Sequence, residues 1–216
     1  AHAVFARHQW GQRRLVVPML AVTAVLSVAG PALRATRIAN VWFVDAAGGP
    51  ARRLTAAVNP ETSPHTVTPL DNATALYCGP NDRHMQLATV AVAGGEPRFL
   101  TAGESSSLNP RAAGGVVVFD RLDTSGVHVW RMDAGGANAA RLTAGAGEQC
   151  AGIARDGRHA IVSHYDAPRK LSVLSTTDGR VVWSEPDVIS NLGFSPGSRS
   201  VLFANRGKEE RGLSFH

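Results

Sequence analysis

The eight histidines of the chain are the residues that most readily suggest metal chemistry. His159 and His164 lie at the start and at the exit of a predicted strand, so the alternation of side chains points them to opposite faces. His128 lies within another predicted strand, at a position that the related segments of the chain fill with apolar residues. No histidines and cysteines have the spacing of a zinc site. We therefore interpret these histidines as structural or surface residues, and the sequence predicts no metal site.

The nucleophiles and the glycine pairs give no stronger case for catalysis. The chain contains no Gly-x-Ser-x-Gly elbow, and the serines at 105–107 are typical of a polar loop. The Gly-Gly pairs lie between two predicted strands, and no Gly-Lys-Ser or Gly-Lys-Thr follows them. They are therefore turn residues rather than a phosphate-binding loop. The sequence predicts a protein with no catalytic residues and no cofactor.

A repeated phrase predicts the architecture that positions these residues. An apolar run of strand length, a Gly-Gly pair and a segment ending in Leu-Thr occur at 41–55, 87–101 and 127–143. A weaker copy, with Asp178-Gly179 at its turn, follows at 171–183. The second turn glycine falls at 49, 95, 136 and 179, which gives steps of 46, 41 and 43 residues. Because Gly-Gly and Asp-Gly pairs supply the positive φ angles of tight turns, each copy predicts a β-hairpin.

A second predicted hairpin lies between successive copies. Short apolar runs follow turn-forming residues at 75–78, 116–119, 160–162 and 201–203. Two hairpins make four strands in a period of about 40–45 residues, which is the size of a propeller blade. The predicted fold is all-β: a β-propeller of four-stranded antiparallel blades over residues 37–216, with about four blades present. A helical solenoid is disfavoured because the apolar runs are short, β-branched and interrupted by glycine pairs.

These phrases resemble the TolB-type β-propeller repeat, whose blades are similar to WD-repeat blades. The resemblance covers residues 37–216 and is carried by the three Gly-Gly…Leu-Thr phrases, which alternate with Ser-Pro-Asp-Gly-like turns. The Ser-Pro-Asp-Gly turn survives only as Ser195-Pro196-Gly197 and Arg155-Asp156-Gly157. The Gly-His…Trp-Asp signature of eukaryotic WD repeats is missing. The resemblance implies a binding scaffold whose partner is another protein of the bacterial cell envelope.

Residues that recur from blade to blade have a structural interpretation. Asp45 and Asp133 precede the glycine turns at equivalent positions, where an aspartate can accept hydrogen bonds from backbone N–H groups just after it. Trp42 and Trp130 also occupy matching positions, and we expect both to pack between blades. Neither pair is predicted to bind a ligand.

The basic residues and the cysteines are interpreted in the same way. Arg53, Arg98 and Arg141 precede the Leu-Thr pairs and are expected to be solvated strand residues, some of them paired with neighbouring acids. The net charge is +5, but no run of five or more basic residues occurs, so we expect no nucleic-acid partner. Cys78 and Cys150 fall on different strands of different blades, which favours two free, buried thiols.

The N-terminal segment, residues 1–36, has three interpretations. Residues 15–33 carry no charge and follow Arg13-Arg14, as in a signal peptide. The same stretch is just long enough for a membrane span, with a proline near each end. Alternatively, residues 12–17 form a short blade strand. Either of the first two places the propeller in the periplasm or elsewhere outside the cytoplasm, and the second anchors it to the membrane.

Three functions fit this organisation. The leading hypothesis is a non-catalytic scaffold for protein–protein interaction in the bacterial cell envelope. The second is the extracytoplasmic sensor or accessory propeller of a membrane-anchored Ser/Thr kinase or transcriptional regulator. The third is the gating propeller of a prolyl-oligopeptidase-like peptidase, which requires a hydrolase domain after His216. Residues 212–215 repeat residues 170–173 at a step of 42, so we expect the sequence to stop as a fifth hairpin begins, as in a truncated propeller.

Overall fold

The computed structural model of the chain describes residues 39–57, 66–166, 169–205 and 213–214. The apolar stretch at 15–33 and the rest of the N-terminal segment lie outside these residues, so its three interpretations stay open. Within the described ranges, no helix is long and apolar enough to cross a membrane.

The described residues form seventeen strands, and none of them lies in a helix. In chain order the strands are β1 (Trp42–Phe43), β2 (Arg52–Arg53), β3 (Val67–Pro69), β4 (Thr74–Asn81), β5 (His84–Ala91), β6 (Arg98–Phe99), β7 (Ser106–Ala113), β8 (Val116–Asp123), β9 (Gly126–Asp133), β10 (Ala140–Arg141), β11 (Glu148–Ile153), β12 (His159–His164), β13 (Lys170–Ser175), β14 (Val181–Pro186), β15 (Val188–Phe194), β16 (Ser200–Asn205) and β17 (Leu213–Ser214).

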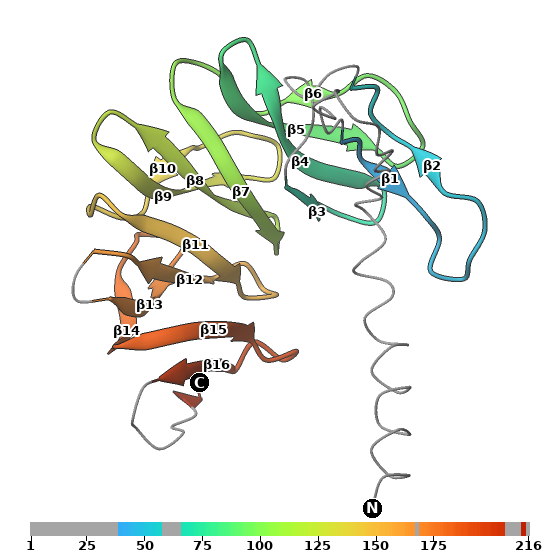
Figure 1. The fold of residues 1–216 in the computed structure, drawn as a ribbon. Coiled ribbons are helices and arrows are strands. Elements are labelled where there is room, and N and C mark those ends of the chain that lie inside the picture. The colour runs from blue at the N-terminus through green and yellow to red at the C-terminus, as the bar shows by residue number, and fades with distance from the viewer. Residues whose placement is uncertain (1–38, 58–65, 167–168, 206–212, 215–216) are drawn as a thin grey trace, which may run out of the picture.

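Consecutive strands pair antiparallel into five sheets, which we call blades 1 to 5. Blades 2, 3 and 4 are the four-stranded sheets β3–β6, β7–β10 and β11–β14. Blade 1 is the pair β1–β2, and blade 5 is the three-stranded sheet β15–β17. The blades follow one another in a fan that does not close into a ring (Figure 1). The predicted fold class, an all-β propeller of four-stranded antiparallel blades, is confirmed.

The glycine pairs occupy the predicted turns. Gly48-Gly49, Gly94-Gly95, Gly135-Gly136 and Asp178-Gly179 each connect the last two strands of a blade. The second glycine of each pair has a positive φ, from +73° at Gly179 to +122° at Gly95. Residues with a Cβ atom rarely adopt these angles, which is the physical reason that glycine recurs at this point of the repeat.

The aspartates before the turns brace them in two ways. Asp45 accepts a hydrogen bond from the backbone N–H of Ala47 at 2.8 Å, as predicted. Asp133 accepts instead from the side chains of Arg131, at 2.7 Å, and Asn138, at 2.6 Å. Both carboxylates therefore have the turn role that their recurrence indicates.

The Leu-Thr pairs close blades 1 to 3 by the same two hydrogen bonds. Thr55, Thr101 and Thr143 each accept, through Oγ1, a backbone N–H bond from the residue fourteen positions earlier, at 2.9 Å in every case. The preceding leucines donate their N–H groups to the carbonyls of these same partners at 2.7–2.8 Å. The threonine hydroxyl thus satisfies a backbone donor beyond the end of a two-residue outer strand, which explains its recurrence.

The hydrophobic core lies between the blades. Side chains alternate along each strand, so Val117 and Phe119 of β8 pack against Leu76 and Leu87 of blade 2. Val118 lies on the other face, in a cluster with Val162 of blade 4. Two further clusters join blade 1 to blade 2 and blade 4 to blade 5. Blades 2, 3 and 4 are therefore each stabilised by two neighbours, as in other repeat architectures.

Two residues test the expectation that the matching tryptophans pack between blades. Trp130 packs against the cluster of blades 2 and 3, with the guanidinium of Arg121 5.0 Å from its ring centroid, as expected. For Trp42 the expectation is wrong, because its side chain is 36% exposed. Its neighbours Val41 and Phe43 face blade 2, so Trp42 lies on the opposite face of blade 1, which no described blade covers.

The cysteines are as predicted. Cys78 lies in blade 2 and Cys150 in blade 4, and both are free and buried. The Cys78 thiol lies 3.2 Å from the carbonyl oxygen of Ser107. Burial raises the pKa of each thiol to about 12, so neither is a thiolate at neutral pH.

Candidate functional site

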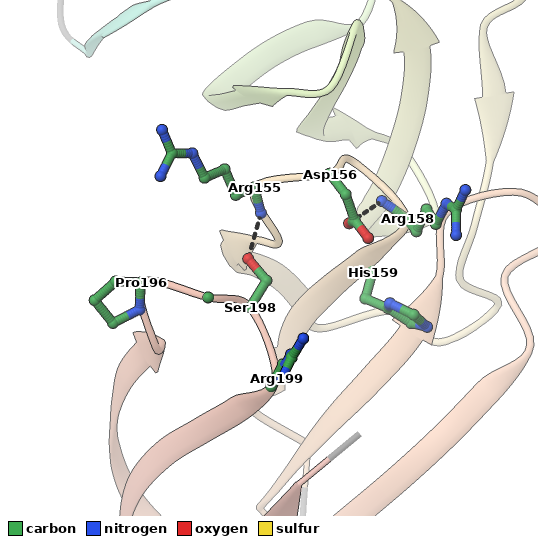
Figure 2. A pocket seen from close by; sticks show the side chains of 8 residues that line it. Arg155, Asp156, Arg158, His159, Pro196, Ser198 and Arg199 are labelled. Carbon is green, nitrogen blue, oxygen red and sulfur yellow. Dashed lines mark hydrogen bonds between the residues drawn. The ribbon is translucent and has the colours of Figure 1, made fainter. Parts of the chain in front are cut away.

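A cavity of about 790 Å³ lies where the first turn of blade 4 meets the first turn of blade 5 (Figure 2). We call it the turn cavity. Its lining comes from the β11–β12 and β15–β16 connections and the adjoining strand ends. The lining residues are Arg155, Asp156, Arg158, His159, Pro196, Gly197, Ser198 and Arg199.

Hydrogen bonds within and between the two turns fix the backbone of the turn cavity. Asp156 accepts the backbone N–H of Arg158 through Oδ1 at 2.9 Å, which shapes the first turn. Ser198 has a φ of +56°, and its N–H donates to the carbonyl of Ser195 at 2.8 Å. The N–H of Arg155 donates to Ser198 Oγ at 2.7 Å, and this bond ties one blade to the next (Figure 2).

The cavity has a surplus of positive charge. Arg155, Arg158 and Arg199 are exposed, and within the described part of the chain their guanidinium groups have no hydrogen-bond or ion-pair partner. Asp156 is the one carboxylate in the lining, and a backbone N–H already occupies its Oδ1 atom. Guanidinium groups bind carboxylates and phosphates through two parallel hydrogen bonds. The turn cavity is therefore equipped to bind an anionic group.

Other arginines of the chain are used differently. Arg98 donates to the carbonyl of Gly135 at 3.4 Å, and Arg141 to the carbonyl of Ala144 at 3.0 Å. Arg52 donates to the carbonyl of Val92. The described contacts of Arg98 are with backbone carbonyl oxygens, and Arg141 also lies 2.9 Å from Nδ1 of His128; no ion pair between either arginine and an acid is found in the described residues. Arg53 is exposed, as expected.

The sequence contained a signal for the turn cavity that the search for metal and nucleophile motifs missed. Arg158 follows Gly157, whose φ is +76°, and Arg199 follows Ser198 in the same left-handed conformation one blade later. An arginine that directly follows the same turn in two successive blades is predicted to lie where the two turns meet. His159 was singled out with His164, but the structure brings only His159 to the cavity.

His164 belongs instead to a buried polar chain across three strands of blade 4. Its Nδ1 atom lies 3.1 Å from Oε1 of Glu148, and its Nε2 atom lies 3.0 Å from the hydroxyl of Ser172. Burial lowers the pKa of His164, and the charge of Lys170 lowers it further. The imidazole is therefore neutral at neutral pH, donating from Nδ1 to the carboxylate and accepting the serine O–H at Nε2.

This order of groups is that of a serine–histidine–carboxylate triad. However, the Ser172 side chain is 0% exposed, so a substrate cannot reach its hydroxyl. The chain of bonds instead joins β11, β12 and β13 within the blade. Sequence reasoning missed it because the three residues become neighbours only through the register of the strands.

His128 also has a structural role, as predicted. It is 1% exposed, and its Nδ1 atom lies 2.5 Å from the carbonyl of Gly145. Its Nε2 atom lies 2.7 Å from the hydroxyl of Ser125 and 3.6 Å from a carboxylate oxygen of Asp123.

Among the residues that the structure describes, no three His, Cys, Asp or Glu side chains could hold a metal ion together.

Asp120 is a buried carboxylate that joins blade 3 to blade 4. Its Oδ1 atom accepts the N–H of Cys150 at 2.7 Å, and its Oδ2 atom accepts the side-chain amide of Asn109 at 2.8 Å. Asn109 reaches it from an irregular point of β7, where its own φ is +48°. Burial raises the pKa of Asp120 to about 6, although these hydrogen bonds and Arg111 act in the opposite direction.

The raised pKa of Asp120 predicts a pH-dependent stability. An aspartate in an unfolded chain titrates near pH ~3.9, so between about pH 4 and 6 the folded chain binds the extra proton. The free energy of unfolding contributed by Asp120 should therefore fall as the pH rises through this window. We expect the wild type to lose roughly 1–3 kcal/mol relative to Asp120→Asn between pH 4.5 and 7, measured by urea unfolding. A difference that does not change with pH would contradict the assignment.

Comparison with known proteins supports the fold. No protein-family model matches the chain, and no curated protein matches it in sequence. Among solved structures, TolB from Acinetobacter baumannii matches with a TM-score of 0.61 and 13% identity, over 92% of this chain and 52% of its own. A TolB candidate from Agrobacterium tumefaciens matches with a TM-score of 0.54 and 16% identity, over 79% of this chain and 65% of its own.

A prolyl endopeptidase structure also matches. The TM-score is 0.58 at 17% identity, over 74% of this chain and 24% of the endopeptidase. The chain thus spans about half the length of the Acinetobacter TolB and a quarter of the endopeptidase. At these identities the similarity concerns the fold alone. With the repeat phrase and the order of the sheets, it shows that the chain has the β-propeller fold found in these TolB structures.

Proposed function

We propose that the chain is a non-catalytic β-propeller scaffold for protein–protein interaction in the bacterial cell envelope. The observation that carries this proposal is the turn cavity, in which Arg155, Arg158 and Arg199 surround a space of about 790 Å³ and have no described side-chain partner. Exposed charge without an internal partner contributes little to stability, but it is available to a ligand.

The rigidity of the turn cavity also supports a binding role. The Arg155–Ser198 hydrogen bond and the cluster of Ile161, Leu171 and Val201 hold blades 4 and 5 together beneath it. A surface that is formed before the partner arrives loses less conformational entropy on binding. The hydroxyl of Ser172 in the triad-like group of blade 4 is buried, so this group is not a candidate for catalysis, which also supports a binding role.

Site-specific photo-crosslinking tests this proposal. A photoreactive amino acid would replace Pro196, at the turn cavity, or Arg83, at the opposite end of the blades, in cells of the source organism. We expect one protein to be crosslinked from position 196, identified by mass spectrometry, and not from position 83. If neither position captures a specific protein, or if the purified chain hydrolyses peptides, the scaffold proposal is wrong.

A gating propeller of a prolyl-oligopeptidase-like peptidase is a second candidate, because a prolyl endopeptidase shares the fold over 74% of this chain. The sensor or accessory propeller of a kinase or regulator would have the same blades. The complete reading frame distinguishes these candidates from the scaffold, since they require a hydrolase, kinase or DNA-binding domain in the same polypeptide.

A further inference from the structure

We infer that the turn cavity binds an acidic peptide segment of the partner, whose carboxylates pair with Arg155, Arg158 and Arg199. This inference rests on the proposed scaffold function and adds the chemistry of the segment that the scaffold recognises. It is carried by the position of the three arginines, by the charges of the neighbouring turns and by the form of the cavity.

The turn cavity brings three arginines without a described side-chain partner to one junction, whereas Arg53 and Arg83, which also lack such a partner, lie outside it. Elsewhere, Arg52, Arg98 and Arg141 donate to carbonyl oxygens, and Arg121 lies over the Trp130 ring. The arginines of the turn cavity have no such contact in the described residues, although they belong to two turns that a hydrogen bond holds together. The N–H donors of three guanidinium groups at one junction are therefore available to a ligand outside the chain.

The arrangement in the cavity fits a ligand with more than one carboxylate. Figure 2 shows the side chains of Arg155 and Arg158 extending to opposite sides, with Arg199 on the other turn. Like charges repel, so this spread is the expected arrangement without an anion. Carboxylates placed along a peptide could pair with each guanidinium in turn. The volume is within the range of ~300–1,000 Å³ that is typical of ligand pockets.

The neighbouring turns favour a short acidic segment over a nucleic acid. The first and third turns of each blade lie at the same end of an antiparallel sheet, and this end also carries the turn cavity. Here turns of blades 1 and 2 expose carboxylates, and blade 4 exposes one in its third turn. These residues are Asp45, Asp71, Glu96 and Asp178. A phosphate backbone running across several blades would meet these charges, whereas a short peptide would contact the basic junction alone.

Fluorescence anisotropy tests the inference. The probe is a fluorescein-labelled octapeptide with four glutamates and an amidated C-terminus, and its matched control carries four glutamines. The double variant Arg155→Ala/Arg199→Ala should weaken binding of the glutamate peptide at least tenfold. Arg155→Lys/Arg199→Lys should lie between the wild type and the alanine variant, because lysine keeps the charge but not the bidentate geometry.

The matched control variant is Arg53→Ala/Arg83→Ala, which removes the same net charge from exposed positions outside the turn cavity. It should change the affinity less than twofold, and the glutamine peptide should bind at least tenfold more weakly to the wild type. All four side chains are exposed, so unchanged thermal melts should show that the variants fold. Equal weakening by both double variants, or binding of the two peptides with equal affinity, would overturn the inference.

Two further results separate the possible failures. If a twelve-nucleotide single-stranded DNA binds more tightly than the glutamate peptide and depends on Arg155 and Arg199, the cavity is a nucleic-acid site and the inference is wrong. If the glutamate peptide does not bind but position 196 still crosslinks to a specific protein, the partner chemistry is wrong and the scaffold proposal stands. If the peptide binds as expected but no protein is crosslinked, the scaffold proposal fails.

Discussion

Replacing Gly114 with alanine should destabilise the chain by about 3–5 kcal/mol, because this turn touches the backbone of the next blade. A Cβ atom at position 114 would lie 2.2 Å from the carbonyl oxygen of Asp156 and 2.7 Å from the backbone nitrogen of Gly157. Backbone atoms in a tight turn cannot move away cheaply, so blades 3 and 4 would have to separate. The φ of +57° at Gly114 adds strain for any residue with a side chain.

Gly115 provides the matched control for this prediction. It has a φ of +78°, but a Cβ atom there would meet nothing within 4 Å. Gly115→Ala should therefore cost only the conformational strain, about 1–2 kcal/mol. Urea unfolding of the two variants measures the difference. Equal losses at positions 114 and 115 would show that the contact between the turns of blades 3 and 4 does not exist.

Replacing Phe119 with alanine should cost about 3–5 kcal/mol, the range for truncating a buried aromatic side chain. Phe119 is 0% exposed and lies between blades 2 and 3, in the cluster that contains Leu76 and Met132. The loss combines the transfer of its ring to water with the cavity left behind. Because the cavity would lie between two blades, the variant should weaken their association rather than disrupt one sheet.

Leu122 lies on the same strand as Phe119 and provides the control. Its side chain is 44% exposed, so Leu122→Ala should change the free energy of unfolding by less than about 0.5 kcal/mol. Chemical denaturation of both variants gives the comparison, and hydrogen exchange locates the loss. If Leu122→Ala costs as much as Phe119→Ala, the core does not lie between the blades.

The repeat made the fold predictable because its residues have local physical roles. A glycine at a positive φ recurs in the hairpins of blades 1 to 4, and a threonine that accepts a backbone N–H bond recurs in blades 1 to 3. Alternating apolar residues then bury both faces of each blade. The repeat does not determine the environment of a terminal blade, which is why Trp42 is exposed although the equivalent Trp130 is packed.

The turn cavity could not be predicted by the search for functional motifs. Its arginines come from turns about one blade apart in sequence, and they meet only because successive blades stack side by side. The hydrogen-bonded group of Glu148, His164 and Ser172 likewise forms only because strand register places these residues side by side. Motif spacing along the sequence detects neither arrangement, whereas aligning the turns of the repeats would have placed Arg158 and Arg199 at equivalent positions.

Mapping the bound glutamate peptide by NMR tests the central claim most directly. Addition of the octapeptide to the isotope-labelled chain should shift the backbone amide signals of residues 155–159 and 197–199, together with the side-chain Nε signals of Arg155 and Arg199. The glutamine peptide should leave these signals in place. If the largest shifts instead occur at the opposite end of the blades, around Arg83 and Ser125, or spread evenly over all exposed arginines, the turn cavity is not the binding site.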